Sequence, residues 1–129
     1  MTSIQIGKLI YATLNSDASL AETLDSKIYP IVAPANTTFP FIVYTRVNAY
    51  VENLTKDGWL NDNVSFQITV VSDNYIQSVE MADAVRELFE NCRISSEELT
   101  MENIRMTSCS EAFNEDEYIQ NLNFTCEAN

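Results

Sequence analysis

The sequence predicts an α+β fold in which an antiparallel sheet of about four to five strands carries two main helices packed on one face. Three observations lead to this prediction. Apolar residues recur at helical spacing in residues 3–14 and 74–91, they alternate with polar residues in residues 64–71, and β-branched and aromatic residues fill residues 41–51. Helices packed against one face of an antiparallel sheet bury the apolar surfaces of both.

The N-terminal third is expected to form a helix followed by extended chain. Helical spacing predicts an amphipathic helix over residues 3–14, and Leu20 and Leu24, four apart, indicate a further helical turn. Residues 27–40 contain all three prolines. Because proline fixes φ and removes a backbone donor, this segment is expected to be turn-rich. A short edge strand within it is predicted to use Ile28, Tyr29, Ile31 and Val32.

The middle of the chain predicts a hairpin and then a helix. Residues 41–51 form one strand, polar residues 52–63 a long loop, and residues 64–71 a half-buried strand with apolar side chains on one face. Asp73 or Asn74 is expected to cap the following helix. The apolar stripe of that helix is predicted to consist of Ile76, Val79, Ala82, Val85, Leu88 and Phe89.

A second hairpin is expected to end the sheet. Apolar and polar residues alternate in residues 104–109 and again in 121–126, on either side of a charged turn at residues 114–117. No repeat or linker divides the 129 residues, so we expect one domain over residues 1–129.

The charge balance bears on possible partners. The chain has 19 acidic and 7 basic residues, a net charge of −12, and 12 of the acids lie in residues 80–129. Because nucleic-acid binding requires Lys and Arg to neutralise phosphates, specific DNA or RNA binding is not expected, nor is binding to anionic membranes. Two interpretations remain open: the acids keep the protein soluble, or they form a surface along which DNA passes without adhering.

Residues suited to catalysis are scarce. The chain has no histidine, and Gly7 and Gly58 do not belong to a phosphate-binding loop. Carboxylates cluster at residues 97–98 and 115–117, where charged turns are the simpler interpretation. We therefore expect no enzymatic activity, no cofactor and no metal site. Cys92, Cys109 and Cys126 form no CxxC motif and are expected to be buried, reduced thiols.

The polar loop contains the clearest candidates for a binding surface. Trp59 and Leu60 are a large apolar pair among polar residues, and Tyr50 ends the preceding strand. Aromatic residues concentrate in the centres of protein interfaces, so these three residues are predicted to contact a partner. The alternative is that Trp59 folds back onto its own domain.

Several short motifs resemble a known family. The passage from Ser26 to Tyr44 reads SKIYPIVAP…FPFIVY, and the later helix contains the segment ADAVR at residues 82–86. In this order, with the surrounding elements, they resemble the tail-completion or tail-terminator proteins of tailed phages and prophages. The resemblance covers nearly the whole chain, but the chain has less glycine and more acid than the family pattern.

The resemblance implies a structural role in a virion. A member of this family is expected to form a homo-oligomeric ring, commonly a hexamer, at the head-proximal end of the tail tube. The ring would stop tube growth and contact the tube protein and the head–tail connector, and DNA could pass through it. Such a protein would be found in the bacterial host cytoplasm during assembly and then in the virion tail. The resemblance transfers no catalytic residue.

Three alternatives differ in function. A head–tail joining (neck) protein of similar size would contact the connector but need not end the tube. A non-viral adaptor domain would remain a monomer and bind one partner at a sheet edge. An enzyme using carboxylate chemistry would need acids from different elements to converge in a pocket.

Overall fold

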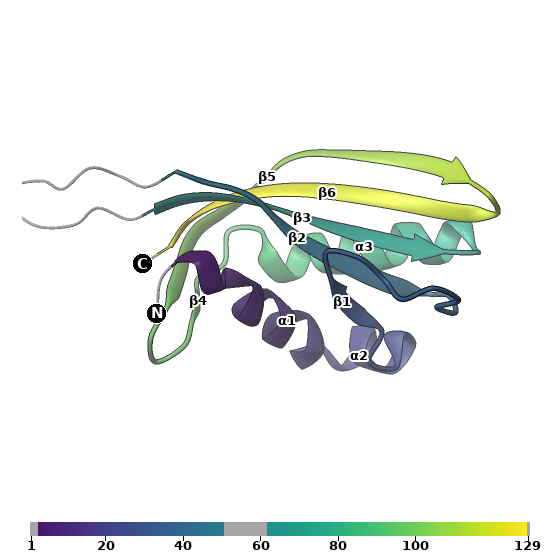
Figure 1. Cartoon of the computed structure of the whole chain (residues 1–129), viewed down its shortest axis with the longest axis horizontal. Helices are drawn as coiled ribbons and strands as arrows, with labels where there is room; N and C mark the ends of the chain where they lie inside the picture. Colours follow the sequence, from purple (N-terminus) through teal and green to yellow (C-terminus); the bar gives the residue numbers. More distant parts are fainter. Residues whose placement is uncertain (1–2, 51–61, 129) are drawn as a thin grey trace, which may run out of the picture.

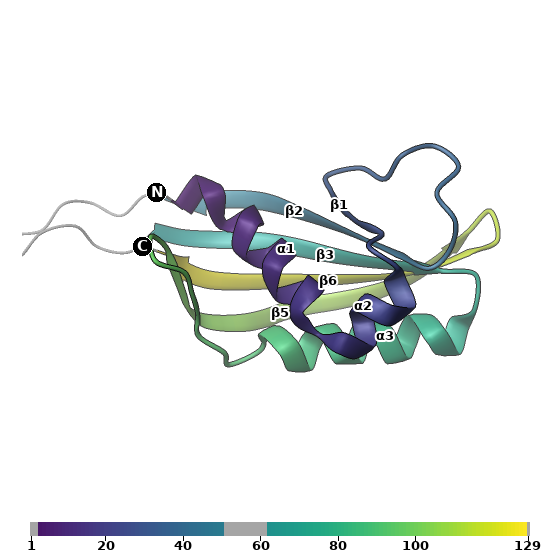
Figure 2. The ribbon, with the colours of Figure 1, turned by 90° about the horizontal axis from the view of Figure 1, so that it is seen from below.

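The structure is a computed structural model that describes residues 3–50 and 62–128. The helical elements are η1 (Ser3–Gln5), α1 (Ile6–Ser16), α2 (Ala18–Leu24) and α3 (Tyr75–Phe89). The strands are β1 (Ile28–Pro30), β2 (Phe41–Tyr50), β3 (Asp62–Ser72), β4 (Ile94–Ser95), β5 (Thr100–Asn114) and β6 (Glu117–Ala128). They form a curled sheet in the order β1-β2-β3-β6-β5-β4, with the helices on one face (Figures 1 and 2).

The α+β class and the helix-covered sheet are confirmed, but the strand count and the purely antiparallel description were wrong. The described sheet has six strands, because β4 pairs with the start of β5, and β1 pairs with β2 in parallel. Strand β4 was missed because two residues are too short to show an alternating pattern in the sequence. The predicted edge strand ends at Pro30, so Ile31 and Val32 lie beyond it.

The predicted alternation on β3 is confirmed and places the core. Val64, Phe66, Ile68 and Val70 are buried on the helix-covered face. On the neighbouring strand β6, Leu122, Phe124 and Cys126 are buried opposite them, with Phe66 in register with Phe124. The core also includes the apolar faces of α1 and α3, which pack across this face of the sheet (Figure 2).

Local hydrogen bonds fix where two of the helices begin. The side chain of Asn74 accepts a hydrogen bond from the backbone N–H of Gln77 at 3.0 Å, so Asn74 is the N-cap of α3, one of the two predicted alternatives. Asp17 caps α2 in the same way through the N–H of Leu20 at 2.9 Å. These caps satisfy donors that the first turn of a helix leaves unpaired.

The predicted apolar stripe of α3 is only partly the buried face. Val85 and Phe89 are buried as expected, but Ile76 and Val79 are exposed. Ser78 and Met81 face the sheet in their place. Helix α3 has apolar residues on two adjoining faces, and packing against β3, β5 and β6 covers one of them.

The second hairpin forms a long arm at one end of the molecule. Strands β5 and β6 pair as far as Asn114 and Glu117, as the predicted charged turn requires. The two turn residues, Glu115 and Asp116, both have positive φ (49° and 67°), which indicates a type I′ turn. Side chains of β5 beyond Met106 are exposed, and the arm projects at the right of Figure 1.

Candidate assembly surfaces

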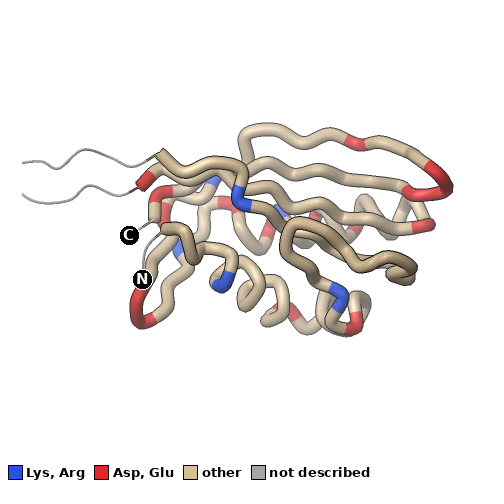
Figure 3. Tube along the Cα trace, in the orientation of Figure 1, with Lys and Arg blue, Asp and Glu red and all other residues tan. Residues whose placement is uncertain are grey.

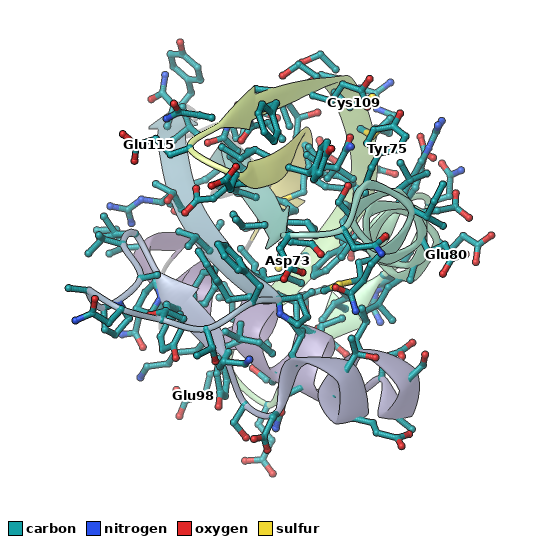
Figure 4. All side chains as sticks on the ribbon, turned by 90° about the vertical axis from the view of Figure 1, so that its right-hand side faces the viewer. Asp73, Tyr75, Glu80, Glu98, Cys109 and Glu115 are labelled. Atoms are coloured by element: carbon teal, nitrogen blue, oxygen red, sulfur yellow. The ribbon has the colours of Figure 1, made fainter. Side chains whose placement is uncertain are left out.

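The carboxylate clusters lie on exposed turns. Residues 97–98 precede β5, and residues 115–117 form the hairpin tip (Figures 3 and 4). Within the part of the chain that the structure describes, no group of three or more Cys, Asp or Glu side chains is placed to hold a metal ion. In the same residues, no helix is both long and apolar enough to cross a bilayer.

The cysteines differ in exposure. Cys126 is buried, and this burial, with a smaller contribution from Glu127, raises the pKa of its thiol to about 12, so the group is neutral at pH 7. Cys92 is half-buried and Cys109 is exposed, so the prediction of three buried thiols was wrong for Cys109. The register shift between Met106 and Ser108 places Cys109 opposite Leu122, on the helix-facing side of the sheet. Cys109 is nevertheless exposed, because it lies in the part of β5 beyond Met106, where the strand continues into the exposed arm.

The uncovered face of the sheet is polar and largely uncharged along its centre. The side chains of Gln67 and Asn123 hydrogen bond at 3.1 Å, and Asn123 also donates to Ser108 at 3.1 Å. Thr69 donates to Asn121 at 2.9 Å. Most charged residues lie instead on turns, helices and strand ends, although Figure 3 also shows a basic residue in the middle of β2 and an acidic one along the β5 arm. This face can offer hydrogen bonds to a partner without strong charge.

One apolar surface lies where α3 meets the β5–β6 arm. Tyr75, at the start of α3, contacts Tyr118 edge-on, and Tyr118 contacts Phe113, with ring centroids 5.6 and 4.9 Å apart. The Tyr75 hydroxyl donates to Glu111 at 3.0 Å, and this hydrogen bond raises the pKa of Tyr75. Phe113 is 60% exposed and Ile76, next to Tyr75, is 61% exposed.

A second apolar surface lies at the end of β2. Arg46 donates a hydrogen bond to the carbonyl oxygen of Ile4 at 2.9 Å. Both residues line a shallow groove, together with Val47 and Asp62 among others. Tyr50, one of the predicted interface residues, pairs with Asn63 in the sheet and is 64% exposed. Trp59 and Leu60 lie outside the described residues.

A third apolar surface is the turn after β1. Ile31 and Val32 are 74% and 72% exposed. Their sequence signal was misread because two β-branched residues after Ile28 and Tyr29 look like the continuation of a strand. Ile76 was likewise assigned to the apolar stripe of its helix by periodicity, which does not reveal how far a neighbouring element covers a side chain.

Exposed apolar side chains that adjoin one another, as Tyr75 and Phe113 do through Tyr118, are a feature of surfaces that contact other proteins. The class of protein indicated is one that assembles with others. Sequence comparison makes this class specific. The family model described as tail completion protein gp17 matches residues 8–128, and the chain belongs to this family of structural phage tail proteins. The resemblance seen in the sequence motifs is thus confirmed, as is a structural role in the phage tail. No curated protein matches the chain by sequence.

Solved structures share the fold. A chain of a structure titled "Virion of native gene transfer agent (GTA) particle" is similar with a TM-score of 0.74 and 18% identity, over 94% of this chain and 92% of that one. A second solved chain has a TM-score of 0.67 and 10% identity, over 98% of this chain and 92% of that one. At these identities the likeness concerns the fold alone.

Proposed function

We propose that this protein forms a ring of identical subunits at the head-proximal end of the tail tube, where it ends tube growth and provides the surface to which the head connector binds. The observation that carries the proposal is the placement of exposed apolar residues on opposite sides of one subunit, in a chain of the tail-completion family. A closed ring requires two different surfaces on each subunit, so that one surface of each subunit binds the other surface of the next.

The charge distribution supports passage of DNA through such a ring. Residues 106–128 contain five acids and no base, and the centre of the open sheet face is uncharged. A surface without Lys and Arg cannot replace the counterions of DNA phosphates, so the duplex does not adhere to it. This favours the interpretation of the net charge of −12 as more than an aid to solubility.

Tube growth in the presence and absence of the protein tests the proposal. Purified tail tube protein is polymerised alone and with increasing amounts of this chain, and tube lengths are measured by negative-stain electron microscopy. We expect shorter tubes, each with additional density at one end. Lengths that do not change, with bare tube ends, would contradict the proposal.

The neck-protein alternative differs from the proposed tail terminator in the particle that the protein binds first. A head–tail joining protein binds filled heads that carry their connector before any tail is present, whereas a terminator binds tubes first. Incubation of the labelled chain with tail-less heads and with head-less tails, followed by gradient sedimentation, distinguishes the two. Sedimentation with heads alone would favour the neck protein.

A further inference from the structure

The turn that follows β1 and the groove between α3 and β5 have complementary properties on opposite sides of the subunit. We propose that, in the ring proposed above and resting on that function, the Ile31–Val32 turn of one subunit inserts into the α3–β5 groove of the next. The α3–β5 groove is lined by Val79, Ala82, Asp83, Met106, Cys109 and Leu122, among others.

The backbone presents Ile31 outward in an unfavourable conformation. The N–H of Ile31 donates to the carbonyl of Tyr44 at 2.8 Å, and the N–H of Val32 donates to the carbonyl of Pro30 at 2.6 Å. This second bond closes a three-residue turn around Ile31, whose φ is 67°. Positive φ is rare for a β-branched residue, and a γ-turn of this hand is strained. Such strain recurs where a residue serves recognition.

The groove has the size and lining to receive these side chains. Helix α3 supplies Val79 and Ala82, and the sheet supplies Met106 and Leu122, so each wall has an apolar part. The polar side chains of Asp83, Arg86 and Gln120 also belong to the lining. Its volume is about 180 Å³, below the roughly 300–1,000 Å³ typical of small-molecule pockets. A groove of this size suits one or two aliphatic side chains of a protein partner.

Charge complementarity identifies the partner as a second copy of this chain. Residues 26–50, which carry the turn, contain Lys27 and Arg46 and no acid. In the groove lining itself the charges of Asp83 and Arg86 offset each other, whereas residues 106–117, which continue from the groove into the arm, contain four acids and no base. Opposite charges on the two surfaces favour contact between copies and disfavour contact of either surface with itself.

The positions of the two surfaces suit a head-to-tail contact. Figure 4 shows Tyr75, Glu80 and Cys109 on one side of the molecule, while β2 and the β1–β2 connection lie on the other. Figure 1 shows the β1–β2 connection toward the end of the long axis at which α3 begins. Two surfaces on opposite sides of a subunit, at similar positions along its long axis, allow the same contact to repeat from subunit to subunit around a rotation axis. This is the geometry of a heterologous ring interface.

Two variants remove the two halves of the contact separately. Ile31→Gly removes the inserted side chain and relieves the positive φ, because glycine adopts it readily. Val79→Glu places a charge in the groove. Matched controls are Asn36→Gly, which puts glycine at another exposed positive-φ position of the same connection (φ 66°), and Ile76→Glu, one helical turn away and outside the groove lining.

The variants are measured by mass photometry of the free protein and by electron microscopy of tube tips. We expect Ile31→Gly and Val79→Glu each to lose the assembled species by at least about tenfold, with a melting temperature within about 4 °C of the wild type. Both controls should assemble normally. An equimolar mixture of the two variants should form a one-to-one dimer and nothing larger, since together they retain one intact turn and one intact groove.

A cross-link locates the contact directly. In Val32→Cys, a short bismaleimide should join the new thiol to Cys109 of the adjacent copy, giving a ladder of covalent multimers on a denaturing gel, and Cys109→Ser in the same chain should abolish the ladder. Normal assembly of Ile31→Gly and Val79→Glu, or no ladder in assembled Val32→Cys, overturns this contact while the ring stands. A wild-type chain that is monomeric both free and on tubes overturns the ring and the contact together.

Discussion

Phe66 of β3 and Phe124 of β6 stack across the centre of the sheet, with ring centroids 5.2 Å apart and planes inclined by 11°. Phe89 of α3 contacts both rings, at 5.8 Å from each. The three side chains are fully buried and join the helix layer to the two central strands. This cluster connects elements far apart in sequence, so the fold depends on it.

Replacement of Phe66 by Ala should therefore destabilise the protein severely. The lost burial and the cavity left behind are expected to lower the free energy of unfolding by about 3–5 kcal/mol. Urea denaturation followed by circular dichroism measures this. Phe113→Ala, at an exposed position, is the control and should cost less than about 0.5 kcal/mol. Equal effects of the two substitutions would contradict the packing described here.

Substitutions at the tip of the β5–β6 arm should stabilise the protein. Glu115 and Asp116 occupy the two positive-φ positions of a type I′ turn, for which Asn-Gly is strongly preferred. The double substitution Glu115→Asn with Asp116→Gly is expected to raise the free energy of unfolding by about 0.5–1 kcal/mol. Glu115→Gln removes a charge without supplying the preferred residues. If it stabilised the protein as much as the double variant, charge repulsion and not turn geometry would be the cause.

Cys126 should make stability depend on alkaline pH. Its folded-state pKa of about 12 lies above the value of about 8.5 expected in the unfolded chain. The unfolded state therefore loses this proton first, and the stabilising contribution, complete below about pH 8.5, is lost as the pH rises towards 12. The slope is up to about 1.4 kcal/mol per pH unit between these values.

Urea midpoints from pH 8 to 10.5 for the wild type and Cys126→Ala measure this slope. The variant should be less stable at pH 7, because it leaves a cavity, but should lose less stability as the pH rises. Cys109→Ala is the control, since Cys109 is exposed. Parallel curves for the wild type and Cys126→Ala would show that the thiol does not titrate in this way.

Trp59 is predicted to contribute to subunit or tube contacts, together with Leu60 and Tyr50. Trp59→Ala should reduce assembly on tube tips by about tenfold or more, the effect expected of a central aromatic interface residue. The melting temperature should stay within about 4 °C of the wild type, because the contact is made between chains. An unfolded or strongly destabilised Trp59→Ala protein would instead place this side chain in the core of its own subunit.

Recognition of the family from the sequence rested on local order along the chain. The proline-rich passage, the alternating strand and the helix after Asn74 are each defined by neighbouring residues, and the family match over residues 8–128 agrees with them. The candidate assembly surfaces were harder to predict from the sequence. Exposure of Ile31, Ile76 and Phe113 depends on whether another element covers them, and periodicity within one segment carries no such information.

The sequence by itself determined the α+β class, the alternating face of β3, a cap for α3 at Asp73 or Asn74, and the charged turn of the last hairpin. These features depend on hydrogen bonds and side-chain directions within a few residues. Only the tertiary structure decided which face of α3 is buried, that β1 runs parallel to β2, and that apolar residues remain exposed on opposite sides of the subunit. Those outcomes depend on packing between elements far apart in the chain, which no local pattern specifies.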